Sequence, residues 1–120
     1  MTQIAQLDDS SSSVAVYILY SGSTPVRAVL YNSQYYTSGT RPTASITLSG
    51  LSKSSVTAKR LTAQAATSRQ DQGQKPTFGG QTFTDGTCVA AGTAQQETTT
   101  VSGGSATFQV GASEALLVQF

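Results

Sequence analysis

The sequence predicts an all-β protein, an antiparallel β-sandwich of about eight strands that forms one domain over residues 1–120. Composition is the first reason. Charged residues make up 11% of the chain, against about 25% in average soluble domains, and Ser, Thr, Gln and Gly replace them. Threonine favours strands, whereas Ser and Gly favour turns. The second reason is short alternating segments separated by turn residues, with no apolar spacing typical of an amphipathic helix.

The strands are expected where apolar residues alternate or run together. They are residues 2–7, Val14–Tyr20, Val26–Tyr31, Ala44–Leu48, Val56–Leu61, Gln96–Val101, Ala106–Val110 and Ala115–Phe120. The second half of Val14–Tyr20 is apolar on both faces. Ser21–Pro25 and the two-glycine segment Ser102–Ser105 predict hairpin turns. Residues 64–94 lack a regular pattern and are expected to form one long irregular loop region, of a kind that is usually functional or packed against something.

Charge and hydropathy exclude two classes of partner. The net charge is +1 and the seven Lys and Arg residues are scattered, so no nucleic-acid partner is expected. No apolar run approaches the roughly 20 residues that span a bilayer, so no membrane partner is expected. The first four residues lack the basic and apolar regions of a signal peptide, which predicts a leaderless or processed chain.

The titratable residues do not predict catalysis, a metal site or a cofactor. The chain has no histidine, which excludes a Ser–His–Asp triad. Its acids are isolated, and the adjacent Asp8 and Asp9 in a polar turn are expected to point into solvent. Cys88 is the single cysteine, so it forms no internal disulfide. We expect a buried thiol or one that pairs with a partner chain.

A family resemblance is carried by segments in a fixed order. The hairpin VAVYILYSGSTPVRAVLYN is followed by YYTSGTRP, then by KRLTAQAATSRQDQGQKPTFGGQTFTDGT and the terminal SEALLVQF. This order resembles the C-terminal β-domain of glycoside hydrolase family 79, the β-glucuronidase and heparanase-like enzymes, and most closely the fungal members. The resemblance implies an extracellular sandwich that packs beside a (β/α)8 barrel, which carries both catalytic carboxylates. Because this chain has no barrel, no catalytic residue is transferred and the domain is predicted not to be an enzyme.

A carbohydrate site is predicted from loop aromatics and nearby polar groups. Aromatic rings suit the C–H faces of sugars, while amides and charges suit their hydroxyl groups. The candidate residues are Tyr35, Tyr36, Arg41, Arg69, Asp71, Phe78, Gln81 and Asp85.

Structural alternatives exist for the first three candidates. One of the two tyrosines, Tyr35 or Tyr36, would pack in the core and the other on the surface. Arg41 would anchor an acidic sugar, or it would lie exposed to solvent beside Pro42, which is the interpretation the sequence favours.

The candidates in the irregular region have alternatives as well. Arg69 and Asp71 would clamp the loop instead of binding a ligand. Phe78 and Phe83 would plug the end of the sandwich, while Gly79-Gly80 would permit a tight turn or bulge between them. The sequence favours the clamp and the plug over ligand contacts.

Two classes of function follow from these observations. The first is a non-catalytic, lectin-like carbohydrate-binding module. The second is a structural or protein-interaction domain, because the resemblance implies an apolar face that supports the barrel. A free copy would cover that face by forming a homodimer, unless the chain is an excised fragment of a complete glycosidase.

Overall fold

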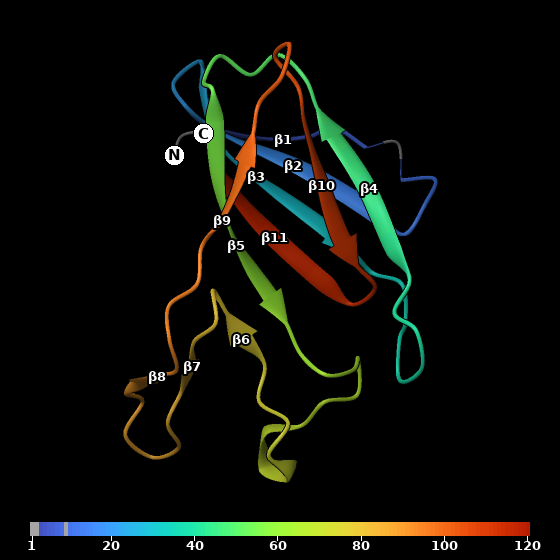
Figure 1. Ribbon diagram of the computed structural model, residues 1–120, viewed down its shortest axis with the longest axis vertical. Coiled ribbons are helices and arrows are strands. Elements are labelled where there is room, and N and C mark those ends of the chain that lie inside the picture. Colours follow the sequence, from blue (N-terminus) through green and yellow to red (C-terminus); the bar gives the residue numbers. More distant parts are fainter. Residues whose placement is uncertain (1–2, 9) are drawn as a thin grey trace.

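The computed structural model describes residues 3–8 and 10–120 and shows a larger antiparallel sheet (Figure 1). Its strands lie in the order β1-β2-β3-β11-β5-β6, and β9 pairs with another part of β5. The bounds are β1 (Gln3–Gln6), β2 (Val14–Ser21), β3 (Thr24–Asn32), β11 (Glu114–Gln119), β5 (Ser55–Thr62), β6 (Thr77–Phe78) and β9 (Glu97–Thr100). The predicted all-β, antiparallel architecture is confirmed.

A second sheet covers one face of the first. It consists of β4 (Thr43–Leu48) and β10 (Ala106–Gly111), which lie in front of the larger sheet in Figure 1. Alternate residues of both sheets point inward because side chains alternate along a strand. The larger sheet contributes Val16, Ile18, Ala28, Leu30, Val56, Ala58, Leu116 and Val118 to the core, and the smaller contributes Ile46, Leu48, Ala106, Phe108 and Val110.

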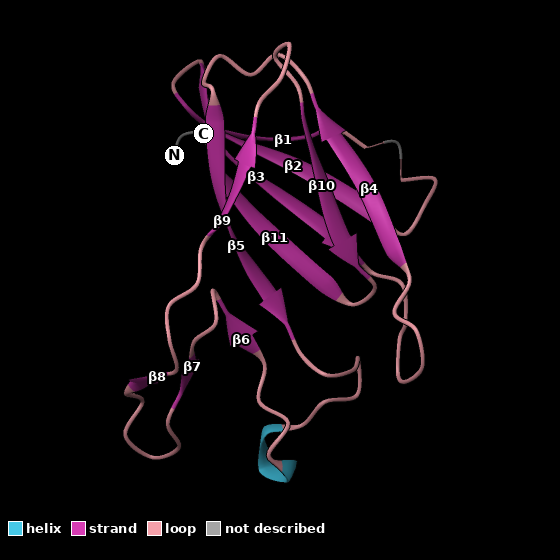
Figure 2. Ribbon diagram, viewed as in Figure 1, coloured by secondary structure: helices cyan, strands magenta, loops and turns pink. Residues whose placement is uncertain are grey.

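The described residues form eleven strands where eight were expected. The additional strands are β6, β7 (Thr82–Phe83) and β8 (Ala90–Ala91), and each has two residues. All three lie in the region predicted to be irregular, where short pairs form as the chain doubles back beyond the end of β5. We call residues 63–96 the extension, and Figure 2 shows it mostly as loop beyond the two sheets.

The only helical element of the described residues is a 3-10 turn in the extension, at Gln70–Gln72. No helix in the described part of the chain is long and apolar enough to cross a membrane.

The two predicted hairpin turns have different outcomes. The first is confirmed and is tighter than expected, because β2 and β3 are separated by only Gly22 and Ser23. At the second, Gly103 and Gly104 take positive φ values of 59° and 77°, and Ser102 bridges Ser105. The prediction that the flanking strands pair is wrong. The strand before this turn, β9, pairs with β5, whereas β10 pairs with β4, so the turn carries the chain between sheets.

Asp8 ties the start of the chain to the sheet. Its carboxylate accepts hydrogen bonds from the Val16 N–H at 2.7 Å, the Ser10 N–H at 3.1 Å and the Gln6 amide at 2.9 Å. The expectation that Asp8 simply points into solvent is therefore wrong, while Asp9 lies outside the described residues. The Val16 bond first, and then the Gln6 bond, lower the pKa of Asp8 below its ordinary 3.8.

The lowered pKa predicts how acid changes the stability of the fold. A carboxyl group with a depressed pKa stabilises the folded state above its unfolded pKa, and this contribution is lost as the pH falls through the folded value. Asp8→Ala should therefore lower the melting temperature at pH 7, and the difference from the natural chain should shrink as the pH falls below 3.8. Thermal melts between pH 7 and pH 2.5 measure this difference.

Asp71→Ala is the matched control, because it removes an exposed carboxylate that bonds within the extension. It should leave the pH dependence close to that of the natural chain. A deficit for Asp8→Ala that is equal at both ends of the pH range would contradict the role assigned to the charge.

Candidate functional site

The larger sheet has a second apolar face that no part of the described chain covers. Strand register places its side chains in three rows across β2, β3, β11 and β5. We call this surface the outer face. It consists of Ala15, Tyr17, Leu19, Arg27, Val29, Tyr31, Thr57, Lys59, Leu61, Ala115, Leu117 and Gln119. Ile4 of β1 and Phe78 of β6 extend it at the edges and are 59% and 42% exposed.

The smaller sheet provides a comparison within the same molecule. Its outward residues are polar, and they pair with each other across the two strands. The Ser45 hydroxyl donates to the Gln109 amide oxygen at 2.9 Å, and the hydroxyls of Thr47 and Thr107 lie 2.8 Å apart. This surface, the polar face, is suited to water. The outer face differs, because its middle row carries Tyr17, Val29 and Leu117, and large apolar surfaces are typical of interaction sites.

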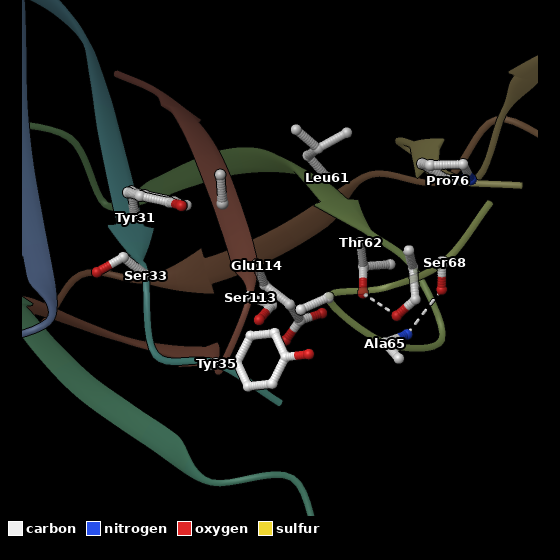
Figure 3. A pocket seen from close by; sticks show the side chains of 13 residues that line it. Tyr31, Ser33, Tyr35, Leu61, Thr62, Ala65, Ser68, Pro76, Ser113 and Glu114 are labelled. Atoms are coloured by element: carbon white, nitrogen blue, oxygen red, sulfur yellow. Dashed lines mark hydrogen bonds between the residues drawn. The ribbon is translucent and has the colours of Figure 1, made fainter. Parts of the chain in front are cut away.

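Two grooves hollow the outer face. The first, of about 470 Å³, lies where the sheet meets the extension and is called the junction groove. Figure 3 shows Tyr35, Ser113 and Glu114 on one side of this groove and Thr62, Ala65 and Ser68 on the other. The second, of about 400 Å³, is called the cation groove. It is lined by Leu19, Arg27, Lys59, Phe78 and Leu117 together with Thr57, Ala58, Gln96 and Gln119.

A cluster of ionic side chains lies at the end of the larger sheet nearest the extension. Glu114 is 9% exposed, and its oxygens lie 3.7 Å from Arg41 and 3.6 Å from Arg60. Arg60 also donates two hydrogen bonds of 2.8 Å to Glu97. The hydrogen bonds to Glu97 are the main cause that raises the pKa of Arg60 above its ordinary value. The cluster connects β5, β9 and β11 at the point where the extension leaves the sheet.

Arg41 belongs to this cluster, and the expectation that it lies exposed beside Pro42 is wrong. Its guanidinium donates to the carbonyl oxygens of Ala63 at 2.7 Å and Gln64 at 3.1 Å, and it lies 4.5 Å from the centre of the Tyr36 ring. The first carbonyls of the extension need donors, and Arg41 supplies them. Of the described side-chain atoms, only its Nε is buried without a hydrogen-bond partner.

The two tyrosines of the same loop separate as one alternative expected, although neither enters the core. Tyr35 is 70% exposed and stands at the junction groove. Tyr36 is half-buried beneath Arg41, and its hydroxyl donates to the Gly39 carbonyl at 2.8 Å. Tyr36 therefore holds the loop, and only Tyr35 presents a free aromatic surface.

The remaining candidates lie in the extension, and the hydrogen bonds and ion pairs of their side chains are to other residues of the extension. The clamp prediction is confirmed, because Arg69 donates from Nε to Asp71 at 2.9 Å and from its second nitrogen to the other carboxylate oxygen. Asp85 accepts a hydrogen bond from Gln70 and lies 3.8 Å from the Lys75 amine. Gln81 donates to the Gly92 carbonyl at 3.3 Å. The predicted carbohydrate residues are thus spread over the loop, the extension and the edge of the outer face.

Other expectations for the extension are partly overturned. The Gly79-Gly80 turn is confirmed: both residues have positive φ, and the Phe78 N–H donates to the Gln81 carbonyl at 2.8 Å. The predicted aromatic plug is wrong, since Phe78 is 42% and Phe83 63% exposed, and Cys88 is an exposed free thiol rather than a buried one. The physical reason is that the extension lies beyond the core, and Gly79 is its one buried residue.

The comparisons with known proteins identify the fold. Residues 16–117 match the glycosyl hydrolase family 79 C-terminal beta domain. This chain belongs to that family of β domains. None of the curated proteins compared with it matches.

A solved structure supports the assignment of a family 79 β domain. It is the crystal structure of a 4-O-alpha-L-rhamnosyl-beta-D-glucuronidase from Fusarium oxysporum 12S in complex with Rha-GlcA. The two proteins share 56% sequence identity with a TM-score of 0.95, over 98% of this chain and 26% of that one. The chain thus spans about a quarter of the length of its solved relative, and the predicted resemblance is confirmed.

The resemblance implied an apolar supporting face on this family 79 β domain, but sequence reasoning did not place that face on the residues of the outer face. Val29, Leu117 and Tyr17 were assigned to strands without a second function. The available signal was the segment Val14–Tyr20, which is apolar on both faces. A strand that alternates cleanly has one wet face, whereas a strand that is apolar on both sides is covered on both.

A packing prediction follows from the ionic cluster. A methyl group at Gly111 would overlap Glu114 Oε1 and lie 2.9 Å from Arg41 Cδ. Gly111→Ala should therefore displace the Glu114 carboxylate and destabilise the fold by roughly 1–3 kcal/mol, the usual cost of overpacking. Urea unfolding of the single variants and of the double variant with Glu114→Ala measures the coupling between the two positions.

The double-mutant cycle separates this contact from a general effect of the substitution. In the Glu114→Ala background the added methyl group has no carboxylate to displace, so most of its cost should vanish. Equal costs in both backgrounds would contradict the proposed clash.

Proposed function

We propose that this family 79 β domain is a non-catalytic accessory domain, whose outer face docks against the catalytic portion of a family 79 glycosidase. The observation that carries the proposal is the contrast between the two outward surfaces of the sandwich. The polar face pairs its own hydroxyl and amide groups, whereas the outer face presents the half-buried apolar side chains of Tyr17, Val29 and Leu117. If both surfaces of the sandwich faced water, both would be expected to carry polar side chains.

The centre of the outer face is suited to stable docking. Val29 and Leu117 lie side by side in the middle row, and Tyr17 adjoins Val29. Each such side chain contributes about 1.5–3 kcal/mol when it is fully removed from water. Aromatic residues near the centre of an interface carry much of its binding energy. The domain would therefore act by contact, with catalysis supplied by the other portion of the enzyme.

The length of the solved relative supports the catalytic portion as the occupant. The rhamnosyl-glucuronidase shares this fold over 26% of its chain, so about three quarters of it lies outside the matched domain. The agreement, a TM-score of 0.95 over 98% of this chain, leaves no room for a displaced extension. The extension of this chain has only one buried residue, yet it follows the same path as in the rhamnosyl-glucuronidase. In that enzyme a further portion of the chain is present that could support it.

A chimera tests the proposal. Residues 1–120 replace the matching domain of the Fusarium oxysporum rhamnosyl-glucuronidase, and Leu117→Asp is introduced into the outer face. We expect the substitution to weaken docking by about 2 kcal/mol or more, as for a central hot spot, which lowers both the melting temperature and the yield of active enzyme. Thr107→Asp on the polar face is the matched control and should leave both unchanged.

Two further measurements complete this test. Melts of the isolated chain with Leu117→Asp show whether the substitution harms the domain itself. Sedimentation of the isolated chain at tens of micromolar tests the alternative occupant, a second copy of the chain. A chimera indifferent to Leu117→Asp, or an isolated homodimer that this substitution disperses without any effect on the chimera, would contradict docking on the catalytic portion.

Carbohydrate binding is the second candidate function, and Tyr35 is the observation that favours it. Its ring is 70% exposed at the junction groove, which also offers the hydroxyls of Ser33, Ser68 and Ser113. Calorimetry with mono- and oligosaccharides at millimolar concentration should then detect binding that Tyr35→Ala abolishes. Phe83→Ala is the control, because it removes an exposed aromatic ring that does not line the junction groove. The absence of heat with every sugar would refute a lectin-like function.

A further inference from the structure

We infer that the partner surface presents carboxylates to Arg27 and Lys59, so that these two cations fix how the outer face docks. The inference rests on the proposed function and adds the chemistry of the partner to it. The charges of the cation groove would select the partner and its orientation on an otherwise largely apolar surface.

Most charged side chains of the described residues are paired within the domain. Four of the seven cations are in ion pairs within the domain: Arg41, Arg60, Arg69 and Lys75. The acids are engaged elsewhere as well. Glu114, Glu97, Asp71 and Asp85 pair with those cations, and Asp8 accepts the Val16 N–H.

Three cations form no ion pair with any described residue, namely Arg27, Lys53 and Lys59. Arg27 and Lys59 both line the cation groove, whereas Lys53 lies in the turn before β5. Two of the three uncompensated positive charges thus share one groove on the face that we propose to dock.

The register shows how the two cations are placed. Arg27 pairs with Gln119, and Lys59 pairs with Leu117 in the next row, so β11 runs between them. Adjacent strands lie about 4.8 Å apart, which puts the backbones of β3 and β5 about 10 Å from each other. Both side chains line the same groove, to which Leu117 and Gln119 of β11 also contribute. The Lys59 amine also lies 6.0 Å from the centre of the Phe78 ring, at the limit of a cation–π contact.

Docking changes the energetics of these charges. Leu19 and Leu117 line the same groove, so their burial also takes Arg27 and Lys59 out of water. A buried charge without a partner costs several kcal/mol, whereas a paired and hydrogen-bonded one does not. No described acid lines the cation groove, and Glu114 at the junction groove is already paired with Arg41 and Arg60, so the compensating carboxylates must come from the partner.

The same charges select between occupants. A second copy of the chain that stacked face to face would offer only the same two cations, and like charges at an interface are repulsive. A surface with carboxylates opposite the cation groove is complementary to it. The outer face is therefore better suited to a different surface, that of the catalytic portion, than to itself.

Charge reversal in the same chimera tests the inference. Arg27→Glu with Lys59→Glu should lower the melting temperature by about 5 °C or more, and the loss should shrink as salt screens the repulsion. Lys53→Glu is the matched control, since it reverses an unpaired cation away from the outer face. It should shift the melting temperature by no more than about 1 °C.

A neutral pair of substitutions completes the design. Arg27→Gln with Lys59→Gln should cost less than the reversal and should flatten the salt dependence. If the isolated chain loses as much stability from the charge reversal as the chimera does, the cations stabilise the domain itself and the inference is overturned.

The failure of this inference is distinguishable from that of the proposed function. If Leu117→Asp weakens the chimera while the charge reversal behaves like Lys53→Glu, docking stands and the carboxylate partner is refuted. If neither substitution has an effect, both are refuted.

Discussion

The larger sheet is apolar on both sides, but the sandwich covers only one of them. β11 shows this most clearly, because Leu116 and Val118 point into the core while Ala115 and Leu117 point outward. The small sheet buries the inner residues and presents hydroxyl and amide groups to water on its own outer surface. The fold, the grooves and the proposed docking all depend on this unequal covering. The proposed docking would provide the second layer that sheets with two apolar faces usually have.

The ionic cluster and the extension depend on the same end of the sheet. Glu114 begins β11, and Arg41 and Arg60 hold it while they also bind the first carbonyls of the extension and Glu97. Beyond this anchor the extension has almost no interior, and its aromatic residues remain exposed. Such a segment is held by hydrogen bonds and turn geometry, and additional contacts from a neighbouring portion would order it further.

Alternation and turn residues were sufficient to predict the antiparallel core from the sequence. The strands around Val16, Leu30, Ile46 and Phe108 follow the period-2 pattern, so the burial of these four residues can be predicted from their neighbours in the sequence. The destination of β9 was not predictable in the same way, because a two-glycine turn can close a hairpin or carry a chain between sheets. The positions of Phe83 and Cys88 depended on whether the extension folds back over the core, which no local pattern encodes.

The candidate site was harder to predict for a related reason. Arg41 and Tyr36 look like ligand contacts in a loop, yet Arg41 binds carbonyl groups more than twenty residues later in the chain, and Tyr36 donates to the Gly39 carbonyl of its own loop. For the outer face the error was the opposite one. Its residues have the pattern of ordinary strand residues and were not identified as a site. An apolar face becomes a site only when the whole fold shows that nothing covers it, and the register across four strands was needed to show that.

The most direct measurement is hydroxyl-radical footprinting of the isolated chain and of the chimera with the Fusarium oxysporum enzyme. If the outer face docks on the catalytic portion, Tyr17, Tyr31 and Leu117 will be oxidised in the isolated chain and protected in the chimera. Leu51, which lies beside the core and away from the outer face, should react equally in both. Equal oxidation of Tyr17, Tyr31 and Leu117 in the two proteins would contradict the account.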